Sequence, residues 1–392
     1  MKFTIDDSVT KQKVKFAVRK PSKDSHIEII DEDQNDTLVR VFAKNGIKGI
    51  EVADNRQDVT VYNMSDGTAI DLENAIAMAQ GSDPIPADSL RNWRIEKDKL
   101  KVVNPVTKAE IELPIVKPGP HTPKHAYEIL GQHEMVFAVA YAFLKNQHLI
   151  LTGPTGTGKT TIYRWFAHVL GYNYIAAPIA RGTESVHLMG TMMPVGPAEF
   201  EWTDGPVSYA ARLSKQHPTI CVLDELNRIG NIAEFSDIYP MLDDTRKLLL
   251  REHRMPDGTT EEIEIGNLYV GATSNPSDDE RADYIGVQDL DPALSSRFKV
   301  QPTVSYPAPE IEVEALMDRV PDLDKALAVK MVRAANQVRD SEDVRFPMSF
   351  RELEGWAMAY PYFGYKDAAK VAVINKAPRD QRASIAGILQ LV

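Results

Sequence analysis

The 392-residue sequence has a single cysteine, Cys221, and no long run of apolar residues. One cysteine excludes an intrachain disulfide framework and is typical of the reducing cytoplasm, where we expect the protein to reside. The longest apolar run, at 135–144, is about half of the roughly 20 residues that a membrane helix needs. The first residues have no apolar core of the signal-peptide type. No contact with a membrane is therefore expected.

An excess of positive charge is also missing. The chain has 45 Lys and Arg against 56 Asp and Glu, which gives a formal net charge of −11. Such a surface as a whole does not attract nucleic acid, although a local basic patch remains open. The basic segment at 11–23 alternates cations with apolar residues, which favours a half-exposed strand over a nucleic-acid contact.

Residues 1–117 are predicted to form a mostly β accessory domain. They contain short alternating stretches separated by turn-forming residues. A helix is expected at 70–80 and a hairpin at 99–115. The predicted strands of this region lie at 13–18, 26–30, 37–43 and 59–64.

In residues 118–306, predicted strands and helices alternate, which is the pattern of an α/β fold with a parallel sheet and helices on both faces. Residues 307–392 are predicted to be a smaller, all-helical domain. The predicted strands lie at 147–152, 173–179, 219–224 and 266–274, and the helices at 132–145, 159–169, 206–214 and 232–242.

A phosphate-binding motif follows the first of these strands. The segment "GPTGTGKTT" has the spacing of a P-loop, with an apolar strand before it and an amphipathic helix after it. The backbone N–H groups of such a loop face phosphate oxygens, Lys159 neutralises the β- and γ-phosphates, and Thr160 ligates Mg²⁺. The expected phosphate-binding residues are Gly153, Pro154, Thr155, Gly156, Thr157, Gly158, Lys159, Thr160 and Thr161.

Two later strands end in polar residues that complete this chemistry. The strand at 219–224 ends in Asp224 and Glu225, at the sheet edge where open α/β folds bind ligands. We expect Asp224 to hold the metal with Thr160, and Glu225 to polarise the attacking water. Asn275 follows the next strand and is a candidate to orient that water, although an Asn-Pro turn explains it equally well on local grounds.

Together these motifs resemble the AAA+ ATPases, in particular the dynein-related, MoxR-like branch that includes the CbbQ and NorQ type, over about residues 125–392. "GPTGTGKTT" is similar to Walker A, "CVLDELNR" to Walker B and "GATSNP" to the sensor-1 strand. Residues 193–212 and 248–270 resemble the two hairpin insertions of this branch. "LDPALSSRF" and "MSFRELEGWA" are similar to its arginine-finger and sensor-2 stretches.

The resemblance implies a ring-forming, Mg²⁺-dependent ATPase, commonly a hexamer, that binds ATP between neighbouring subunits. Arg297 would be the finger that enters the neighbour's site. Locally, Asp291 and Pro292 predict the start of a helix of about two turns that ends near Arg297. We expect Arg297 to have its partner on the next subunit, the alternative being an ordinary helix-end cation.

The lid contributes a second arginine. Ser349 and Glu352 have the spacing of a capping box, which puts Arg351 in the first helical turn, where the dipole disfavours a cation. The resemblance assigns Arg351 to sensor 2, in contact with the γ-phosphate, with Arg345 as the alternative. A metal site at His121, His125 and His133 is disfavoured because no cysteine or acid lies at ligand spacing.

These observations are compatible with three hypotheses about the function. The leading one is a ring ATPase that remodels or matures a protein partner. The second is a nucleic-acid-dependent motor of the helicase or restriction type, since such NTPases share the core. The third is a nucleotide-gated scaffold with little turnover. The resemblance does not cover the first 118 or so residues, so the partner and the role of the N-terminal domain stay open.

Overall fold

The computed structural model describes residues 90–229, 232–276 and 289–390, together with seven strands between residues 3 and 70. The chain divides into two compact units. One comprises Met1–Ile85 with Asp324–Lys330, and the other comprises Pro86–Leu323 with Met331–Val392.

The N-terminal unit contains one antiparallel sheet with the strand order β5-β4-β3-β2-β1-β6-β7. Its strands confirm the mostly β character predicted from the alternating sequence. The predicted helix at 70–80 lies outside the described residues. The strands are β1 (Phe3–Asp7), β2 (Lys13–Arg19), β3 (His26–Asp31), β4 (Thr37–Ala43), β5 (Ile47–Val52), β6 (Val59–Asn63) and β7 (Ala69–Ile70).

A second small sheet belongs to the other unit. It is formed by β8 (Trp93–Glu96), β9 (Lys99–Val103) and β10 (Glu110–Pro114), so the hairpin expected at 99–115 is present. Leu100 and Leu113 are buried in the same core cluster as helix α3 (His133–Leu144). The sequence placed the domain boundary near residue 117, whereas the compact units divide at residue 85 because this hairpin packs on the core that follows it.

A parallel sheet with the order β11-β18-β15-β12 forms the centre of this core. Its four strands are β11 (Leu149–Thr152), β12 (Asn173–Pro178), β15 (Thr219–Asp224) and β18 (Leu268–Ser274). Two isolated bridges add Val300 and Thr303 alongside β11. The strand positions agree with the predicted ones.

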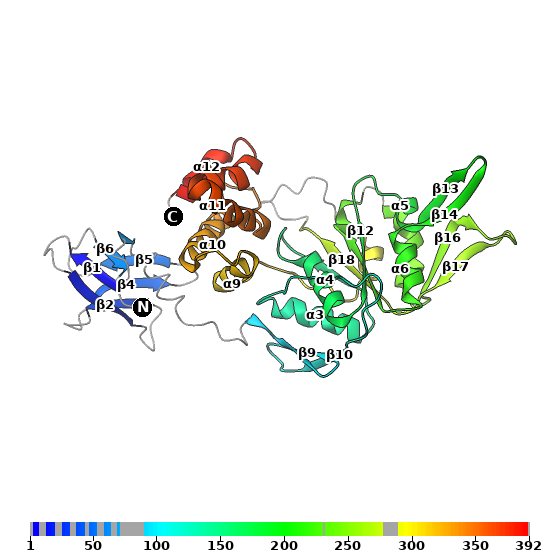
Figure 1. The fold of residues 1–392 in the computed structure, drawn as a ribbon, viewed down its shortest axis with the longest axis horizontal. Coiled ribbons are helices and arrows are strands. Elements are labelled where there is room, and N and C mark those ends of the chain that lie inside the picture. The colour runs from blue at the N-terminus through cyan, green and yellow to red at the C-terminus, as the bar shows by residue number, and fades with distance from the viewer. Residues whose placement is uncertain are drawn as a thin grey trace. The chain divides into compact units, whose positions relative to one another are not determined.

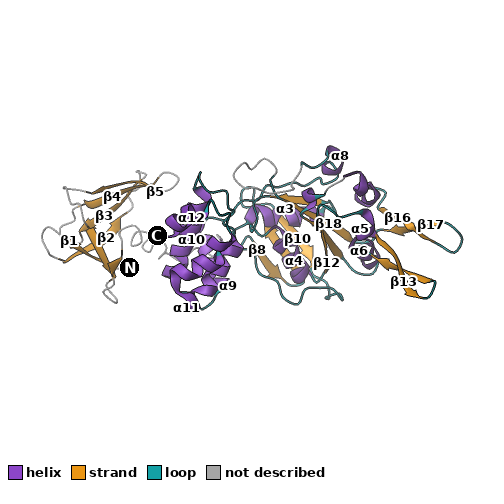
Figure 2. Cartoon of the chain, turned by 90° about the horizontal axis from the view of Figure 1, so that it is seen from above, coloured by secondary structure: helices purple, strands orange, loops and turns teal. Residues whose placement is uncertain are grey.

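Both faces of the sheet are buried, as the continuous apolar run of β15 requires. Ile220 and Val222 lie in the cluster that contains α3 and α4 (Lys159–Leu170). Cys221 and Leu223 lie in the opposite cluster, with α6 (Pro206–Ser214). Figures 1 and 2 show α3 and α4 on one side of the sheet and α6 on the other. Burial raises the pKa of the Cys221 thiol to about 12, so this cysteine is an inert core residue.

The segment after β15 differs from the helix predicted at 232–242. It forms two 3₁₀ stretches, η2 (Leu226–Arg228) and η3 (Ile232–Ile238), and then a single α-helical turn, α7 (Tyr239–Leu242). Pro240 lacks the N–H that an α-helix extending through this position would use, so the α-helical part begins only here. Two other short helices are α5 (Ser185–Met189) and α8 (Pro292–Ser295).

Two antiparallel hairpins extend together from the core beside α6 (Figures 1 and 2). They are formed by β13 (Gly190–Gly196) with β14 (Glu199–Asp204), and by β16 (Lys247–Arg254) with β17 (Thr260–Glu264). Both overlap the segments where hairpins were expected, 193–212 and 248–270, and begin before them. Arg212 of α6 joins them, with Nε 2.7 Å from Asp204 and Nη1 2.6 Å from Glu261.

The C-terminal region is helical, as predicted. It contains α9 (Pro309–Arg319), α10 (Lys325–Asp340), α11 (Phe350–Ala372), η4 (Ile374–Lys376) and α12 (Arg382–Gln390). Arg339 forms two hydrogen bonds with the fully buried carboxylate of Glu312 and thereby joins α10 to α9. None of the helices that the structure describes is long and apolar enough to cross a membrane.

Candidate nucleotide site

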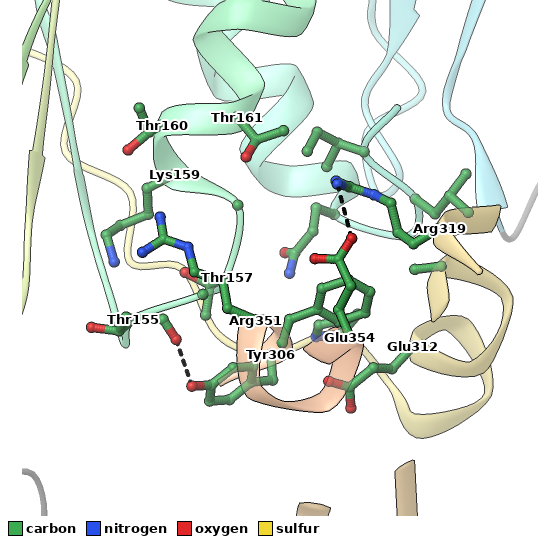
Figure 3. A pocket seen from close by; sticks show the side chains of 18 of the residues that line it. Thr155, Thr157, Lys159, Thr160, Thr161, Tyr306, Glu312, Arg319, Arg351 and Glu354 are labelled. Carbon is green, nitrogen blue, oxygen red and sulfur yellow. Dashed lines mark hydrogen bonds and ion pairs between the residues drawn. The ribbon is translucent and has the colours of Figure 1, made fainter. Parts of the chain in front are cut away.

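A pocket lies where the P-loop meets the helical lid. The loop connects β11 to α4, and Gly156 and Gly158 have φ angles of 82° and 90°, which disfavour residues that carry a Cβ. A Cβ on Gly156 would also lie 2.6 Å from the Cβ of Ser349. The lid thus lies directly against the loop. Residues Thr155 through Thr161 all line the pocket, and Figure 3 labels five of them. Gly153 and Pro154 precede them in the chain and are not among the lining residues.

Lys159 lies in this pocket and is 8% exposed. Its ammonium donates to the carbonyls of Gly153 at 2.6 Å and Pro154 at 2.7 Å, and to the side chain of Asn275 at 3.3 Å. Burial lowers the pKa of Lys159 to about 8, although the charge of Asp224 partly opposes this shift. A phosphate group, by supplying negative charge, would favour the protonated ammonium.

Asp224 connects the loop to two strands. Its Oδ1 accepts hydrogen bonds from the hydroxyls of Thr160 and Thr273, each at 2.7 Å. A hydroxyl and a carboxylate in contact beside a phosphate site are the oxygen donors that Mg²⁺ takes in such proteins. The two residues therefore have the chemistry to hold a magnesium ion. Thr273 was not foreseen, because nothing in a buried strand marks one threonine as a partner of Asp224.

Glu225 adopts a left-handed backbone conformation, with φ 59° and ψ 44°. For a residue with a Cβ this costs about 1 kcal/mol or more, and such strain is concentrated at functional sites. The turn places Glu225 on the pocket wall, where its carboxylate forms an ion pair with Arg228 Nε at 2.9 Å. Its backbone N–H donates to Thr273.

The backbone of Asn275 is held by the side chain of Asn227. Asn227 donates to the Asn275 carbonyl at 2.6 Å and accepts from its N–H at 3.2 Å. The Asn275 side chain is 4% exposed, and its Nδ2 has no hydrogen-bond partner in the described part of the chain. A buried amide donor without a partner is costly, so this group is a candidate to bind a ligand.

The lid supplies Arg351, which extends into the pocket toward Lys159 (Figure 3). Ser349 caps α11 and accepts from the N–H of Arg351 at 3.2 Å. The expected capping box does not form, because Glu352 accepts the Ser349 hydroxyl and also contacts Lys376. Arg345 is not among the residues that line the pocket; its N–H donates to Gln381.

The sequence patterns did not predict several of the residues that line or border the pocket. The hydroxyl of Tyr306 donates to the carbonyl of Thr155 at 2.7 Å, and Arg319 lies over the ring of Tyr127 at 3.3 Å and pairs with Glu354 (Figure 3). The lid brings these residues to the P-loop, and no local pattern marks them. Glu128, Ile129, Leu130 and Phe350 also line the pocket.

Arg297 lies outside this pocket. Asp291 caps α8 as predicted, accepting from Ala293 and Leu294, but the helix is one turn rather than two. The expectation that Arg297 lacks a partner in its own chain is wrong. Its Nε lies 2.8 Å from Asp243 Oδ1, and its Nη2 donates to Oδ2 at 3.1 Å. Asp243 lies far away in the sequence, so the contact is created only by folding.

Comparison with known proteins agrees with this geometry. Residues 148–298 match the AAA domain of the dynein-related subfamily. Residues 148–298 thus form an AAA domain. This match covers the P-loop, Asp224, Asn275 and Arg297, and it assigns the site to the P-loop NTP hydrolases.

Two curated proteins are similar to part of this chain. The chain is 26% identical over 189 residues to the chaperone MoxR1 of Mycobacterium tuberculosis, a match that covers 48% of this chain and 44% of the relative. It is also 30% identical over 123 residues to the STICHEL-like 3 protein of Arabidopsis thaliana, covering 28% of this chain and 11% of the other. The chain thus spans less than half the length of either relative.

Among solved structures, a variant of RuvB from Thermotoga maritima aligns with a TM-score of 0.38 and 14% identity. The alignment covers 66% of this chain and 68% of that one.

Proposed function

We propose that this protein is an Mg²⁺-dependent ATPase that works as a ring, commonly a hexamer, and remodels or matures a protein partner. The observation that carries the proposal is the side-chain amide of Asn275: its Oδ1 accepts from Lys159, and its buried Nδ2 has no hydrogen-bond partner among the residues that the structure describes. A buried donor next to a buried ammonium, both on a P-loop pocket, fits the γ-phosphate of a nucleotide and its attacking water.

In this mechanism each residue has one task. The P-loop N–H groups and Lys159 bind the phosphates, and Thr160 and Asp224 hold Mg²⁺, which supplies charge neutralisation for the phosphoryl group. Glu225 accepts the proton of the attacking water, and Asn275 orients that water by its amide. Arg351, reaching into the pocket from the lid, contacts the γ-phosphate and links the lid to the state of the nucleotide.

Ring formation is supported by the place of Arg297. This arginine belongs to the AAA domain but does not line the pocket of its own chain. A finger that acts on the neighbouring subunit accounts for a cation held at the surface, away from its own nucleotide. Such fingers stabilise the charge of the transferring phosphoryl group.

A protein partner is favoured over nucleic acid by the hairpin of β13 and β14. The hairpin has Glu199, Glu201 and Asp204 and no Lys or Arg, whereas binding to nucleic acid relies on cations that neutralise phosphates. It also exposes a set of apolar side chains, which suits contact with a polypeptide. These are Met192, Met193, Val195 and Phe200.

The ATPase and the ring are tested together by measuring phosphate release as protein concentration is raised, with ring mass followed in parallel. We expect specific activity to rise as the ring forms and to be lost when Mg²⁺ is chelated. A rate per subunit that is equal in the monomer and the ring would contradict the shared site. Tight ATP binding with negligible turnover would instead favour the nucleotide-gated scaffold.

The partner is tested with Glu225→Gln held in ATP, which should bind nucleotide without hydrolysing it. We expect the variant to retain a protein from native lysate and to release it when ATP is removed. A matched Lys159→Ala protein, unable to bind the phosphates, is the control. Recovery of nucleic acid, together with a DNA-stimulated rate that falls steeply with salt, would support the motor reading instead.

A further inference from the structure

The guanidinium of Arg297 is held on three sides within its own chain. Nε forms an ion pair with Asp243 Oδ1 at 2.8 Å, without a directed hydrogen bond, and Nη2 donates to Oδ2 at 3.1 Å. Nη1 donates to the carbonyl of Ala293 at 2.6 Å. The ring of Tyr239 lies 4.2 Å from the guanidinium carbon, a cation–π contact. The Arg297 side chain is therefore only 24% exposed.

These contacts leave part of the guanidinium available. Each terminal nitrogen carries two N–H groups, and contacts within the described residues use one on Nη1 and one on Nη2. One N–H on each nitrogen remains. Two neighbouring donors of a planar guanidinium match two oxygens of a phosphoryl group. The arrangement orients Arg297 without using up its ability to bind phosphate.

Tyr239, Asp243 and Ala293, which contact Arg297, form a platform for it. The segments that carry this platform pack on the core behind the nucleotide site. Leu294 and Phe298, on either side of the arginine, are buried in one cluster with Met241 of α7. The same cluster includes Cys221 and Leu223 of β15, the strand that delivers Asp224 and Glu225. A shift of the segment after Glu225 would therefore move the platform of Arg297, because packed cores transmit small displacements.

We propose that Asp243 and Tyr239 are positioning residues for Arg297. Through them, the Asp224–Glu225 segment of each subunit determines the orientation of the Arg297 guanidinium that the same subunit presents to the next one. The inference rests on the proposed trans finger. It assigns a role to two residues that do not line their own pocket. Asp243 has a 41% exposed side chain, so solvent screens its charge, and it orients the guanidinium more than it neutralises it.

The test uses rings mixed from two kinds of subunit. Acceptors carry Arg297→Ala, so they hydrolyse ATP only with a neighbour's finger. Donors carry Asn275→Ala, which lowers their own hydrolysis by about 10²–10³-fold and leaves the Asp224–Glu225 segment and the finger unmutated. The rate of the mixture then reports the donor's finger alone. We expect Asp243→Asn in the donor to lower kcat of the mixture about tenfold, as a small misplacement of a catalytic group does, with KM for ATP unchanged.

The rate should fall only when the donor subunits carry Asp243→Asn, and a merely structural role of Asp243 would not produce this dependence on the subunit. Moving Asp243→Asn from donor to acceptor should restore the rate, since the acceptor's own finger is absent. Tyr239→Phe in the donor should keep the rate because the ring remains, whereas Tyr239→Leu should lower it several-fold. Asp244→Asn, a neighbouring exposed acid, is the matched control and should have no effect. Ring mass is checked for every mixture.

The outcomes separate the two proposals. If the parent mixture of Arg297→Ala and Asn275→Ala subunits is inactive in intact rings, the trans finger fails and the positioning role fails with it. If that mixture is active but Asp243→Asn donors match it, the positioning role alone is overturned. A rate that rises with Asp243→Asn would show instead that Asp243 restrains the finger, which also overturns the proposal.

Discussion

The nucleotide pocket and the Arg297 segment hold their cations in opposite ways. Lys159 is buried, its contacts are two backbone carbonyls and an amide oxygen, and its pKa is lowered to about 8. Arg297 lies nearer the surface and has a carboxylate partner and an aromatic ring. The first arrangement favours a ligand that brings negative charge into the pocket. The second orients a permanent cation by contacts within its own chain, away from the pocket of that chain.

Under the proposed function, this difference separates the residues that a chain supplies to its own site from the arginine that we propose it supplies to a neighbour. Lys159, Thr160, Asp224 and Asn275 converge on one pocket, whereas Arg297 does not line it. We therefore expect a single subunit to bind nucleotide but to hydrolyse it poorly. Four predictions test this division, from the largest expected effect to the smallest.

Arg297→Ala should lower the turnover of the assembled ring by about 10³–10⁵-fold, because the charge on the transferring phosphoryl group loses its stabilising cation. Nucleotide affinity should change little, since Arg297 is not part of the pocket of its own chain. Steady-state phosphate release and fluorescent-nucleotide binding measure the two quantities. Normal turnover of the Arg297→Ala variant in intact rings would contradict a catalytic role of Arg297.

Glu225→Gln should lower kcat by about 10²–10⁴-fold, the usual contribution of a general base. Binding of ATP should persist, because the phosphates are held by the P-loop and Lys159. Single-turnover hydrolysis and equilibrium binding check the two parts. Asn275 and Asp224 are intact in this variant, so a turnover that stays within twofold of the parent would mean that the water is activated elsewhere.

Asn275→Ala should lower kcat by about 10²–10³-fold, as the loss of one buried donor to the transition state does. The backbone contacts with Asn227 do not involve the deleted amide, so thermal unfolding should remain close to that of the parent. Comparison of kcat with the unfolding temperature checks this. If stability fell as strongly as activity, the role of Asn275 would be structural.

The affinity for ATP should weaken as pH rises above about 8, by up to tenfold per pH unit. The Lys159 ammonium in the free protein loses its proton near pH 8, whereas bound phosphates favour the charged form. Binding is therefore strongest below pH 8, and above it each binding event must take up a proton. Calorimetric titration from pH 6.5 to 9.5, in buffers with different ionisation enthalpies, measures affinity and proton uptake together.

Lys159→Arg is the control for the pH experiment. Arginine stays charged throughout this range, so any affinity that it retains should not change with pH. A parent protein whose affinity is also constant up to pH 9.5 would mean that the environment of Lys159 does not favour the neutral amine.

The order of the α/β core could be read from local patterns. Short continuous apolar runs predicted the positions of β11, β12, β15 and β18, because a strand buried on both faces requires continuous apolar residues. The helix predicted at 232–242 was wrong, since 3₁₀ structure precedes Pro240 and only one α-helical turn begins there. Similarly, Glu352 takes the Ser349 hydroxyl instead of closing the expected capping box.

By itself the sequence determined the chemistry of the P-loop pocket and the start of α8. The P-loop depends on glycines at fixed spacing, and the cap of α8 depends on Asp291 two residues before the N–H that it binds. Both are local, so the order of residues is sufficient. Only the tertiary structure decided that Asp243 holds Arg297, that Tyr306 and Arg319 reach the P-loop, and that β9 and β10 pack with α3. These contacts join segments far apart in the chain, and they arise only when the burial of apolar side chains brings those segments together.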